Sequence, residues 1–174
     1  MRAGLKWWRT YHAVVATPVR VVELVGGILA WAGVRVIVAA SLFAVIAGIG
    51  GAFLSPLAAL TPLAALLCGL AFGALLTAIT SAVGNDEWLP AIFRFGIVPL
   101  FLFSGTFFPV EQLPDWLEPL AWATPLWHGV ELCRDLATGE VEAVATVVHV
   151  TYLVAATVLG AYFAVRAHRG LLLR

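Results

Sequence analysis

The stretch VIVAASLFAVIAGIGGAFL, residues 36–54, contains no charged side chain, and a second uncharged run, LAALTPLAALLCGLAFGALLTAITSAV, follows it at residues 57–83. Crossing about 30 Å of hydrocarbon takes ~20 residues of helix, because every backbone polar group must be satisfied within the segment. Both runs meet that requirement. Ser55 and Pro56 separate them, and proline cannot continue a helix, so the runs are predicted to form a tight hairpin of transmembrane helices.

The composition agrees with a membrane location. Of the 174 residues, 62% are hydrophobic and only 11% are charged, so the chain cannot present enough polar surface to be soluble as one globule. The formal net charge is zero, whereas nucleic-acid binding requires a basic face. We therefore expect an all-α integral membrane protein in contact with the lipid bilayer, with a single domain over residues 1–174 and no nucleic acid as partner.

Two further runs extend the pattern. Residues 143–165 contain only His149 as an ionisable group, and residues 95–110 are uncharged but number only sixteen. The prediction is therefore four transmembrane helices, at 36–54, 57–83, 95–110 and 143–165. Residues 1–35 form a cytoplasmic juxtamembrane segment in this scheme, and residues 111–142 form an external segment.

The distribution of charge predicts the orientation. Nine of the ten Lys and Arg residues fall on one side if the chain crosses four times: Arg2, Lys6, Arg9, Arg20, Arg35, Arg94, Arg166, Arg169 and Arg174. The tenth, Arg134, shares the segment 111–142 with Glu111, Asp115, Glu118, Glu131, Asp135, Glu140 and Glu142. By the positive-inside bias both termini are cytoplasmic, in the plasma or inner membrane of the cell, and the acidic segment faces outward.

The sequence lacks the motifs of an ATPase or a hydrolase, because it contains no GxxxxGK[ST], GxSxG or HExxH pattern. No metal-ligand spacing is present, and with Cys68 in an apolar run and Cys133 in a polar loop we expect no disulfide. No Asp, Glu, Lys or Arg falls inside the four runs, which disfavours an ion-coupled carrier. We predict no catalytic residue, no metal and no cofactor on this chain. His149 is expected to hydrogen-bond a neighbouring helix or reach the membrane interface.

Small residues recur at helical spacing in the first two runs: Ala40, Ala44 and Gly48, then Ala65, Gly69 and Gly73. Because lipid provides little hydrophobic drive between helices, close backbone approach through such faces supplies the packing. Packing within one chain is favoured over a dedicated dimer interface.

The predicted external segment, residues 111–142, begins within the stretch FSGTFFPVEQLP at residues 103–114. It is too apolar for an ordinary solvated loop. Its tryptophans prefer the lipid headgroup level, so residues 111–142 are predicted to lie on the outer leaflet or to re-enter it as short helices. Pro114, Pro119 and Pro125 would separate these helices. The alternative is an interfacial segment that serves only as an anchor.

The residues of this segment resemble a known family. Leu113-Pro114, ten residues, Pro125-Leu-Trp-His128, five residues and Arg134 form a pattern similar to the permease subunits of the ABC-2 class of ABC transporters. The branch that it resembles contains the nodulation lipo-oligosaccharide exporters and related efflux permeases. Near the N-terminus, YHAVVATP at residues 11–18, followed by Glu23 and Gly26, looks like the cytoplasmic segment that carries the coupling helix of that class.

The resemblance implies a permease that exports an amphiphilic substrate such as a lipo-oligosaccharide, a drug or a polysaccharide-like molecule. Separate ABC ATP-binding subunits would supply the energy and bind ATP and Mg, and two permeases would form a homodimer or heterodimer. We expect the external gate at Ser104, Gly105, Pro109, Leu113, Pro114, Pro125, His128 and Arg134. We expect the contact with the ATP-binding subunit at Lys6, Trp7, Trp8, Arg9, Tyr11, Pro18 and Glu23.

Several alternatives stay open from the sequence. Arg134 could instead pair with Glu131 or Asp135, or with headgroup phosphates, and the basic N-terminal segment could be an anchor on anionic lipid. The chain could be an accessory subunit that does not transport. Since permeases of the class have six spans and this chain offers four, the resemblance also implies a truncated permease, with the first two spans absent, which could be inactive.

Overall fold

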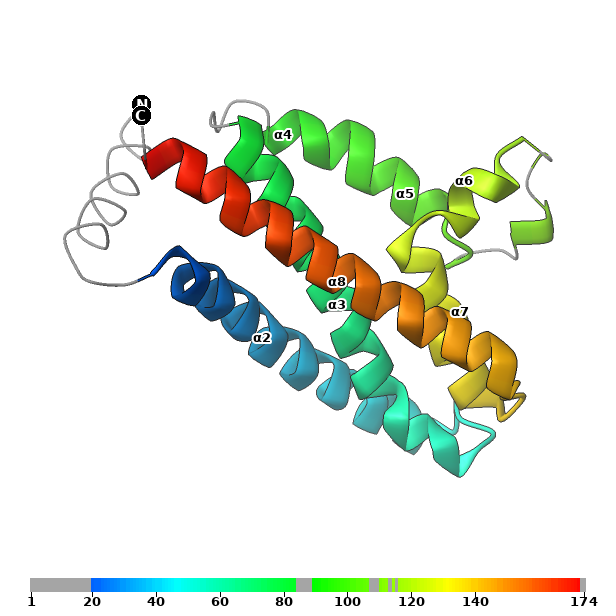
Figure 1. The fold of residues 1–174 in the computed structure, drawn as a ribbon. Coiled ribbons are helices and arrows are strands. Elements are labelled where there is room, and N and C mark those ends of the chain that lie inside the picture. Colours follow the sequence, from blue (N-terminus) through cyan, green and yellow to red (C-terminus); the bar gives the residue numbers. More distant parts are fainter. Residues whose placement is uncertain (1–19, 84–88, 107–109, 113, 115, 173–174) are drawn as a thin grey trace.

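The computed structural model describes residues 20–83, 89–106, 110–112, 114 and 116–172, and this part of the chain is helical without any strand. Three long helices lie side by side (Figure 1): α2 (Val21–Ile49), α3 (Thr61–Val83) and α8 (Ala143–Leu172). Among the described residues, three helices are long and apolar enough to cross a membrane, and they correspond to these elements. The prediction of an all-helical membrane protein is confirmed, whereas the fourth span is not.

The first two long helices form the predicted hairpin. A short 3₁₀ helix, η1 (Pro56–Leu60), connects them, and Ser55 caps it by accepting a hydrogen bond from Leu57 N at 3.2 Å. α3 begins at Thr61, so Pro62 lies in its first turn. The missing N–H of a proline costs no intrahelical hydrogen bond at that position.

α2 begins at Val21, well before the uncharged run that starts at residue 36. Glu23 closes its first turn, because Oε2 accepts a hydrogen bond from Arg20 N at 2.9 Å in the manner of a capping box. Apart from Arg35, the residues that follow up to residue 36 are uncharged, so nothing interrupts the helix there. Residues 21–35, assigned from the sequence to a juxtamembrane segment, are therefore part of α2.

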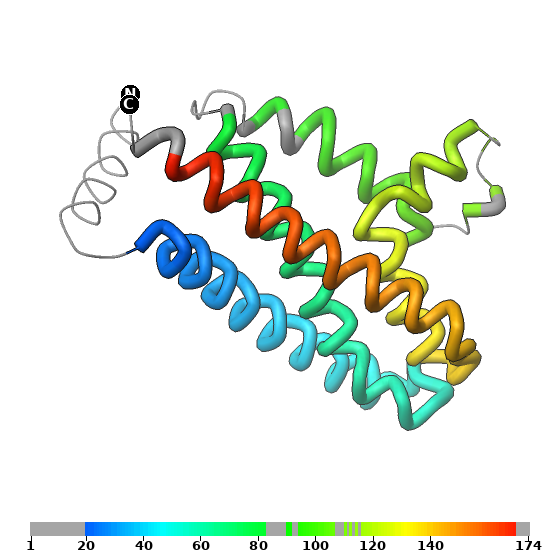
Figure 2. The backbone as a smooth tube through the Cα atoms, in the orientation of Figure 1, coloured from blue at the N-terminus to red at the C-terminus, as the bar shows by residue number. Residues whose placement is uncertain are grey.

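α3 and α8 run in the same direction. At one end of the bundle Ser81 Oγ lies 2.9 Å from His168 Nδ1, and at the other end Leu54 N donates to Ala137 O at 3.0 Å, shortly before α8 begins. The chain between α3 and α8 must therefore return along the whole bundle. It does so in pieces (Figure 2): α4 (Leu89–Ala91), the π-helix η3 (Ile92–Ile97), α5 (Val98–Phe103), η4 (Val110–Gln112), α6 (Glu118–Trp122) and α7 (Pro125–Thr138).

The structure differs here from the single helix predicted over residues 95–110. The consecutive helical elements α4, η3 and α5 begin at Leu89 and end at Phe103, a length of about 22 Å at 1.5 Å per residue, which is shorter than the hydrocarbon core. α7 covers the remaining part of the return, antiparallel to α3: its Gly129 packs on Cys68 and the following Gly139 packs on Ser55. Two short helical segments thus replace one predicted span.

Close packing of small residues holds the long helices together. A Cβ added at Gly69 of α3 would lie 2.9 Å from Val36 Cγ2 of α2, so the predicted small-residue face of α3 does pack within the chain. Between α8 and α3 the approach is closer still, since a Cβ at Gly160 would lie 2.8 Å from the backbone of Ala74. Leu153, about two turns before Gly160 on α8, is fully buried.

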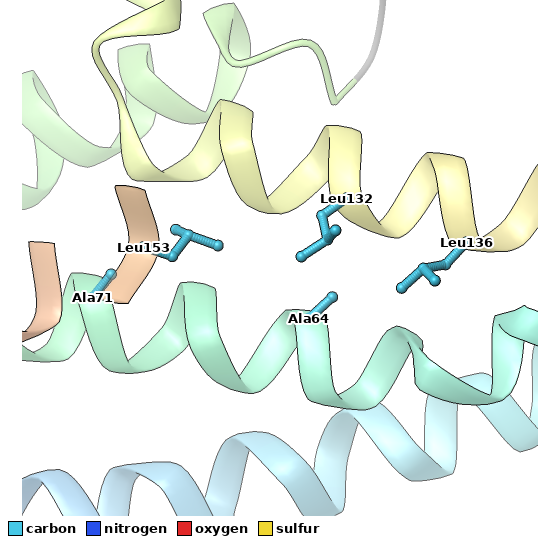
Figure 3. Close-up of a cluster of buried hydrophobic side chains, with 5 residues drawn as sticks. All are labelled: Ala64, Ala71, Leu132, Leu136 and Leu153. Atoms are coloured by element: carbon cyan, nitrogen blue, oxygen red, sulfur yellow. The ribbon is translucent and has the colours of Figure 1, made fainter. Parts of the chain in front are cut away.

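A cluster of buried side chains fixes α7 against α3 and α8 (Figure 3). Its members are Ala64, Ala71, Leu132, Leu136 and Leu153. Leu132 and Leu136 lie one turn apart on α7 and point toward Ala64 of α3. Fully burying a leucine contributes about 1.5–3 kcal/mol, so these side chains anchor α7 and position the polar groups on its other faces.

Candidate functional site

α5 ends in a tight, buried turn at residues 104–106. Ser104 is 1% exposed, and its Oγ donates to Phe101 O at 3.2 Å and lies 2.8 Å from Thr106 Oγ1. Gly105 has φ +82°, a conformation that residues with a Cβ rarely adopt. A Cβ at this position would also lie 3.1 Å from Val110 Cγ2. The turn therefore requires glycine both for its backbone and for space.

Arg134 of α7 ties this turn to the bundle. Its Nη2 donates to Gly105 O at 2.7 Å, and its Nη1 donates to Glu131 Oε1 at 2.5 Å. The ion pair is partly exposed, with 41% of the Arg134 side chain accessible, so the pair by itself contributes on the order of 0–1 kcal/mol. The bond to the carbonyl of the buried glycine has a charged donor and is worth roughly 1.5–3 kcal/mol. Arg134 thus pairs with Glu131, one of the alternatives left open by the sequence, and also holds the turn.

The start of α7 is defined by local sequence. Thr124 is the N-cap, because its Oγ1 accepts a hydrogen bond from Trp127 N at 3.3 Å, and Pro125 occupies the first helical position, where proline is preferred. Both residues are buried. The Thr124 hydroxyl also donates to Ala121 O at 2.7 Å, so the end of α6 and the start of α7 form one rigid corner.

His128 of α7 and His149 of α8 form a buried pair. They are 5% and 6% exposed, and their Nδ1 atoms lie 2.7 Å apart. A hydrogen bond between two ring nitrogens needs one N–H and one lone pair, so one Nδ1 donates and the other accepts. The pair therefore binds α7 to α8.

Aromatic rings surround this pair. Tyr152 of α8 stacks on His128 with ring centroids 3.9 Å apart, and its hydroxyl donates to Ala123 O at 2.5 Å. Trp127 contacts His128 and His149 edge-on, at 4.9 and 5.2 Å between centroids. One cluster, made of Trp127, His128, His149 and Tyr152, thereby connects the end of α6 with α7 and α8. We call it the histidine cluster.

The opposite side of α7 packs on α3. A Cβ at Gly129 would lie 2.5 Å from Cys68 Sγ, and the Cys68 thiol donates to Pro125 O at 3.6 Å. The prediction that Cys133 lies in a polar loop was wrong, because this residue lies in α7. α7 is amphipathic and turns Cys133 toward α3, where its thiol donates to Thr61 O at 3.8 Å. Both cysteines are free, and the described residues contain no group of three potential ligands that could hold a metal ion.

The predicted gate residues divide into three sets. Ser104, Gly105, Pro125, His128 and Arg134 lie at the junction of α5 with α7. Pro114 is exposed and accepts a hydrogen bond from Leu117 N at 2.7 Å, in the turn that leads to α6. Pro109 and Leu113 lie outside the described residues.

The predicted coupling residues fall mostly outside the described part of the chain, namely Lys6, Trp7, Trp8, Arg9, Tyr11 and Pro18. Glu23 is described, and its carboxylate caps the first turn of α2.

The sequence had indicated that His149 bonds a neighbouring helix, but it did not identify His128 as the partner or Tyr152 as the ring stacked on that partner. The spacing of His128 and His149 could not reveal their contact, because they lie 21 positions apart on two different helices. Only the packing determines how far α7 is shifted along α8.

Comparison with known proteins gives an independent assignment. Residues 8–137 match the family described as ABC-2 type transporter. Nodulation protein J of Rhizobium meliloti (strain 1021) is 32% identical over 139 residues, which cover 79% of this chain and 52% of that protein. Nodulation protein J of Rhizobium leguminosarum bv. trifolii is 33% identical over 133 residues, covering 75% and 50%. The chain spans about half the length of the curated relatives it matches. No solved structure matches it significantly.

Proposed function

Because the chain belongs to the ABC-2 type transporter family, we propose that it is a membrane-spanning permease subunit of an ABC exporter driven by separate ATP-binding subunits. The chain itself is not an enzyme in this proposal. ATP and Mg bind to the partner subunit, and two permeases, identical or different, form the working unit. The assembly resides in the plasma or inner membrane.

The proposed substrate is amphiphilic. Support comes from the relatives named Nodulation protein J and from the resemblance of residues 103–134 to the branch with nodulation lipo-oligosaccharide exporters. A lipo-oligosaccharide, a drug or a polysaccharide-like molecule fits this class. Such a molecule can leave along a leaflet, so no wide aqueous pore is required.

We propose four crossings with both termini in the cytoplasm. The parallel arrangement of α3 and α8 supports this, since the chain has to return to the opposite end of the bundle between them. The return is made by the helical stretch from Leu89 to Phe103 together with α7. In this proposal α6 and α7 re-enter the membrane from the outer side, and the acidic segment 111–142 faces outward.

The single observation that carries the gate is the bridge from Arg134 to Gly105 O. It connects the end of the short helical stretch to α7, which in turn is bonded to α8 through the histidine cluster. A movement of α5 would therefore be passed to α7 through one charge-assisted hydrogen bond. On the cytoplasmic side, the segment from Lys6 to Pro18 would receive the push of the ATP-binding subunits.

Reconstitution tests the proposal. The chain is expressed with its ATP-binding subunit, and ATP-dependent movement of a fluorescent acylated oligosaccharide is measured in proteoliposomes. We expect Arg134→Gln to reduce transport while the ATP-binding subunit still copurifies, and Arg166→Gln, an exposed arginine near the end of α8, to leave transport unchanged. Unchanged transport in Arg134→Gln would refute the gate. Copurification with the ATPase but no ATP-dependent transport by the wild type would instead indicate an accessory subunit.

A further inference from the structure

Arg35 lies at the centre of a membrane-spanning helix. α2 extends over Val21–Ile49, and Arg35 is the middle residue of that range, although the sequence had placed it on the cytoplasmic side of the first span. The next residue, Val36, packs on Gly69 of α3. Gly69 is in turn the middle residue of the span Pro56–Ala82. Two adjacent helices therefore place Arg35 at half height.

The third long helix gives the same height. Gly160 of α8 packs on Ala74 of α3, so the middle of α8 lies level with residues near Gly69 of α3. If the membrane were instead centred on residues 36–54, the apolar cytoplasmic half of α3 would extend into water. The three spans can be buried together only when Arg35 is near the bilayer centre.

A charged side chain at that depth is costly, and such residues almost always face protein or a water-filled cavity and interact with a partner. Arg35 is exposed on the surface of the chain, and no hydrogen bond or ion pair joins it to any described residue. On the same face Trp31 is 65% exposed and Leu42 is 61% exposed. Lipid can cover the apolar side chains of this face but not the guanidinium group, so something polar must cover the arginine.

The other described long helices offer no carboxylate for that purpose. α3, the stretch from Leu89 to Phe103 and α8 contain no Asp or Glu. Glu23 of α2 lies at the far start of that helix, where it accepts a hydrogen bond from Arg20 N, so the described spans of a second copy would not neutralise Arg35 either. A guanidinium group is well suited to bind a phosphate, sulfate or carboxylate group. Next to it, Ile37, Val38, Ser41, Leu42 and Val45 form an open, nearly flat apolar strip along the same helix.

We propose that this face of α2 lines the substrate path and that Arg35 binds an anionic group of an amphiphile whose apolar part lies along the strip. The inference rests on the proposed export function and adds a charge requirement to it. Water and substrate then bind the Arg35 guanidinium group in turn. This explains how a cation without a partner among the described residues of the chain is tolerated near the bilayer centre.

The test uses the chain assembled with its ATP-binding subunit in phosphatidylcholine nanodiscs. The probes are dodecyl phosphate and uncharged dodecanol, and the readout is the concentration that half-maximally stimulates ATP hydrolysis. Because a hydrogen-bonded charge pair is worth a factor of roughly ten or more in affinity, we expect dodecyl phosphate to act at a concentration about tenfold lower than dodecanol. Arg35→Gln should abolish this preference, Arg35→Lys should keep part of it, and Arg166→Gln should keep all of it.

A second measurement does not depend on ATP hydrolysis. Arg35→Cys should react with an anionic, water-soluble methanethiosulfonate reagent, and dodecyl phosphate should slow the reaction. A thiol that does not react would place the position in lipid and overturn the proposal. Equal preference for dodecyl phosphate in the wild type and Arg35→Gln would also overturn it. Loss of subunit assembly in Arg35→Gln with the preference retained would assign the arginine to a subunit ion pair instead.

These failures are distinguishable from failure of the export function. If ATP drives transport of the acylated oligosaccharide in both the wild type and Arg35→Gln, and neither distinguishes the two probes, only the charge requirement is wrong. If the wild type moves no substrate with ATP, the exporter proposal itself fails.

Discussion

Replacing Gly105 with alanine tests whether the turn after α5 is built as described. The residue has φ +82°, and a Cβ would lie 3.1 Å from Val110 Cγ2. Placing alanine in the left-handed region costs about 1–2 kcal/mol. The contact with Val110 adds to this, and the backbone shift that relieves it moves the carbonyl that accepts the hydrogen bond from Arg134.

Gly51 provides a matched control, because its φ is +72° and an added Cβ would meet nothing within 4 Å. Gly51→Ala therefore carries the backbone cost alone, about 1–2 kcal/mol. Gly105→Ala carries that cost plus part of the roughly 1.5–3 kcal/mol of a charge-assisted hydrogen bond. We expect a total of about 2–4 kcal/mol for Gly105→Ala.

Thermal unfolding in nanodiscs measures the difference. A change of 1 kcal/mol shifts the midpoint by about 2–4 °C for a chain of this size, so Gly105→Ala should unfold several degrees below Gly51→Ala. Transport in proteoliposomes should fall only in Gly105→Ala. Equal midpoints for the two variants, with equal transport, would show that the turn and its bond to Arg134 do not have the role assigned to them.

The remaining predictions concern helix packing and the hydrogen bond from Arg134 to the turn. Gly160→Ala places a Cβ 2.8 Å from the α3 backbone. We expect the free energy of unfolding to fall by about 1–3 kcal/mol or more, which thermal unfolding would measure as a lower midpoint. Gly96→Ala, whose added Cβ would meet nothing within 4 Å, should unfold like the wild type. Arg134→Lys keeps the charge but not the planar fork, so its midpoint should lie below that of the wild type, and an unchanged midpoint would argue against the bridge to the turn.

The sequence was sufficient for the class of protein, and it indicated several residues that the structure brings close together. Uncharged runs near residues 36–54, 57–83 and 143–165 predict long helices because hydrocarbon excludes unsatisfied backbone groups, and the structure has a long helix at each. The residues between Ser104 and Arg134 were recognised as a unit from their motif. The sequence predicted both Arg134 and Gly105 as gate residues, although their hydrogen bond could not be foreseen across 29 positions.

Helix ends were less predictable, and this changed the reading of Arg35. Counting only uncharged residues starts the first span at residue 36, yet a helix continues through a single charged residue when apolar residues flank it. The prediction of a single helix over residues 95–110 was wrong for the opposite reason, because the helix ends at Phe103, before the uncharged run does. This run is uncharged throughout, but Gly105 adopts a left-handed conformation that ends the helix, and hydropathy contains no information on backbone conformation.

The sequence by itself therefore determined that this chain lies in a membrane as a set of helices, because apolar length and charge are local properties of the chain. Only the tertiary structure decided the level along the bundle at which each side chain lies. The contact of Val36 with Gly69 sets the height of Arg35, and the packing of α7 between α3 and α8 brings His128 within 2.7 Å of His149. Such relations depend on how far one helix is shifted along another, and that shift is fixed by the interlocking of small and large side chains across the whole bundle.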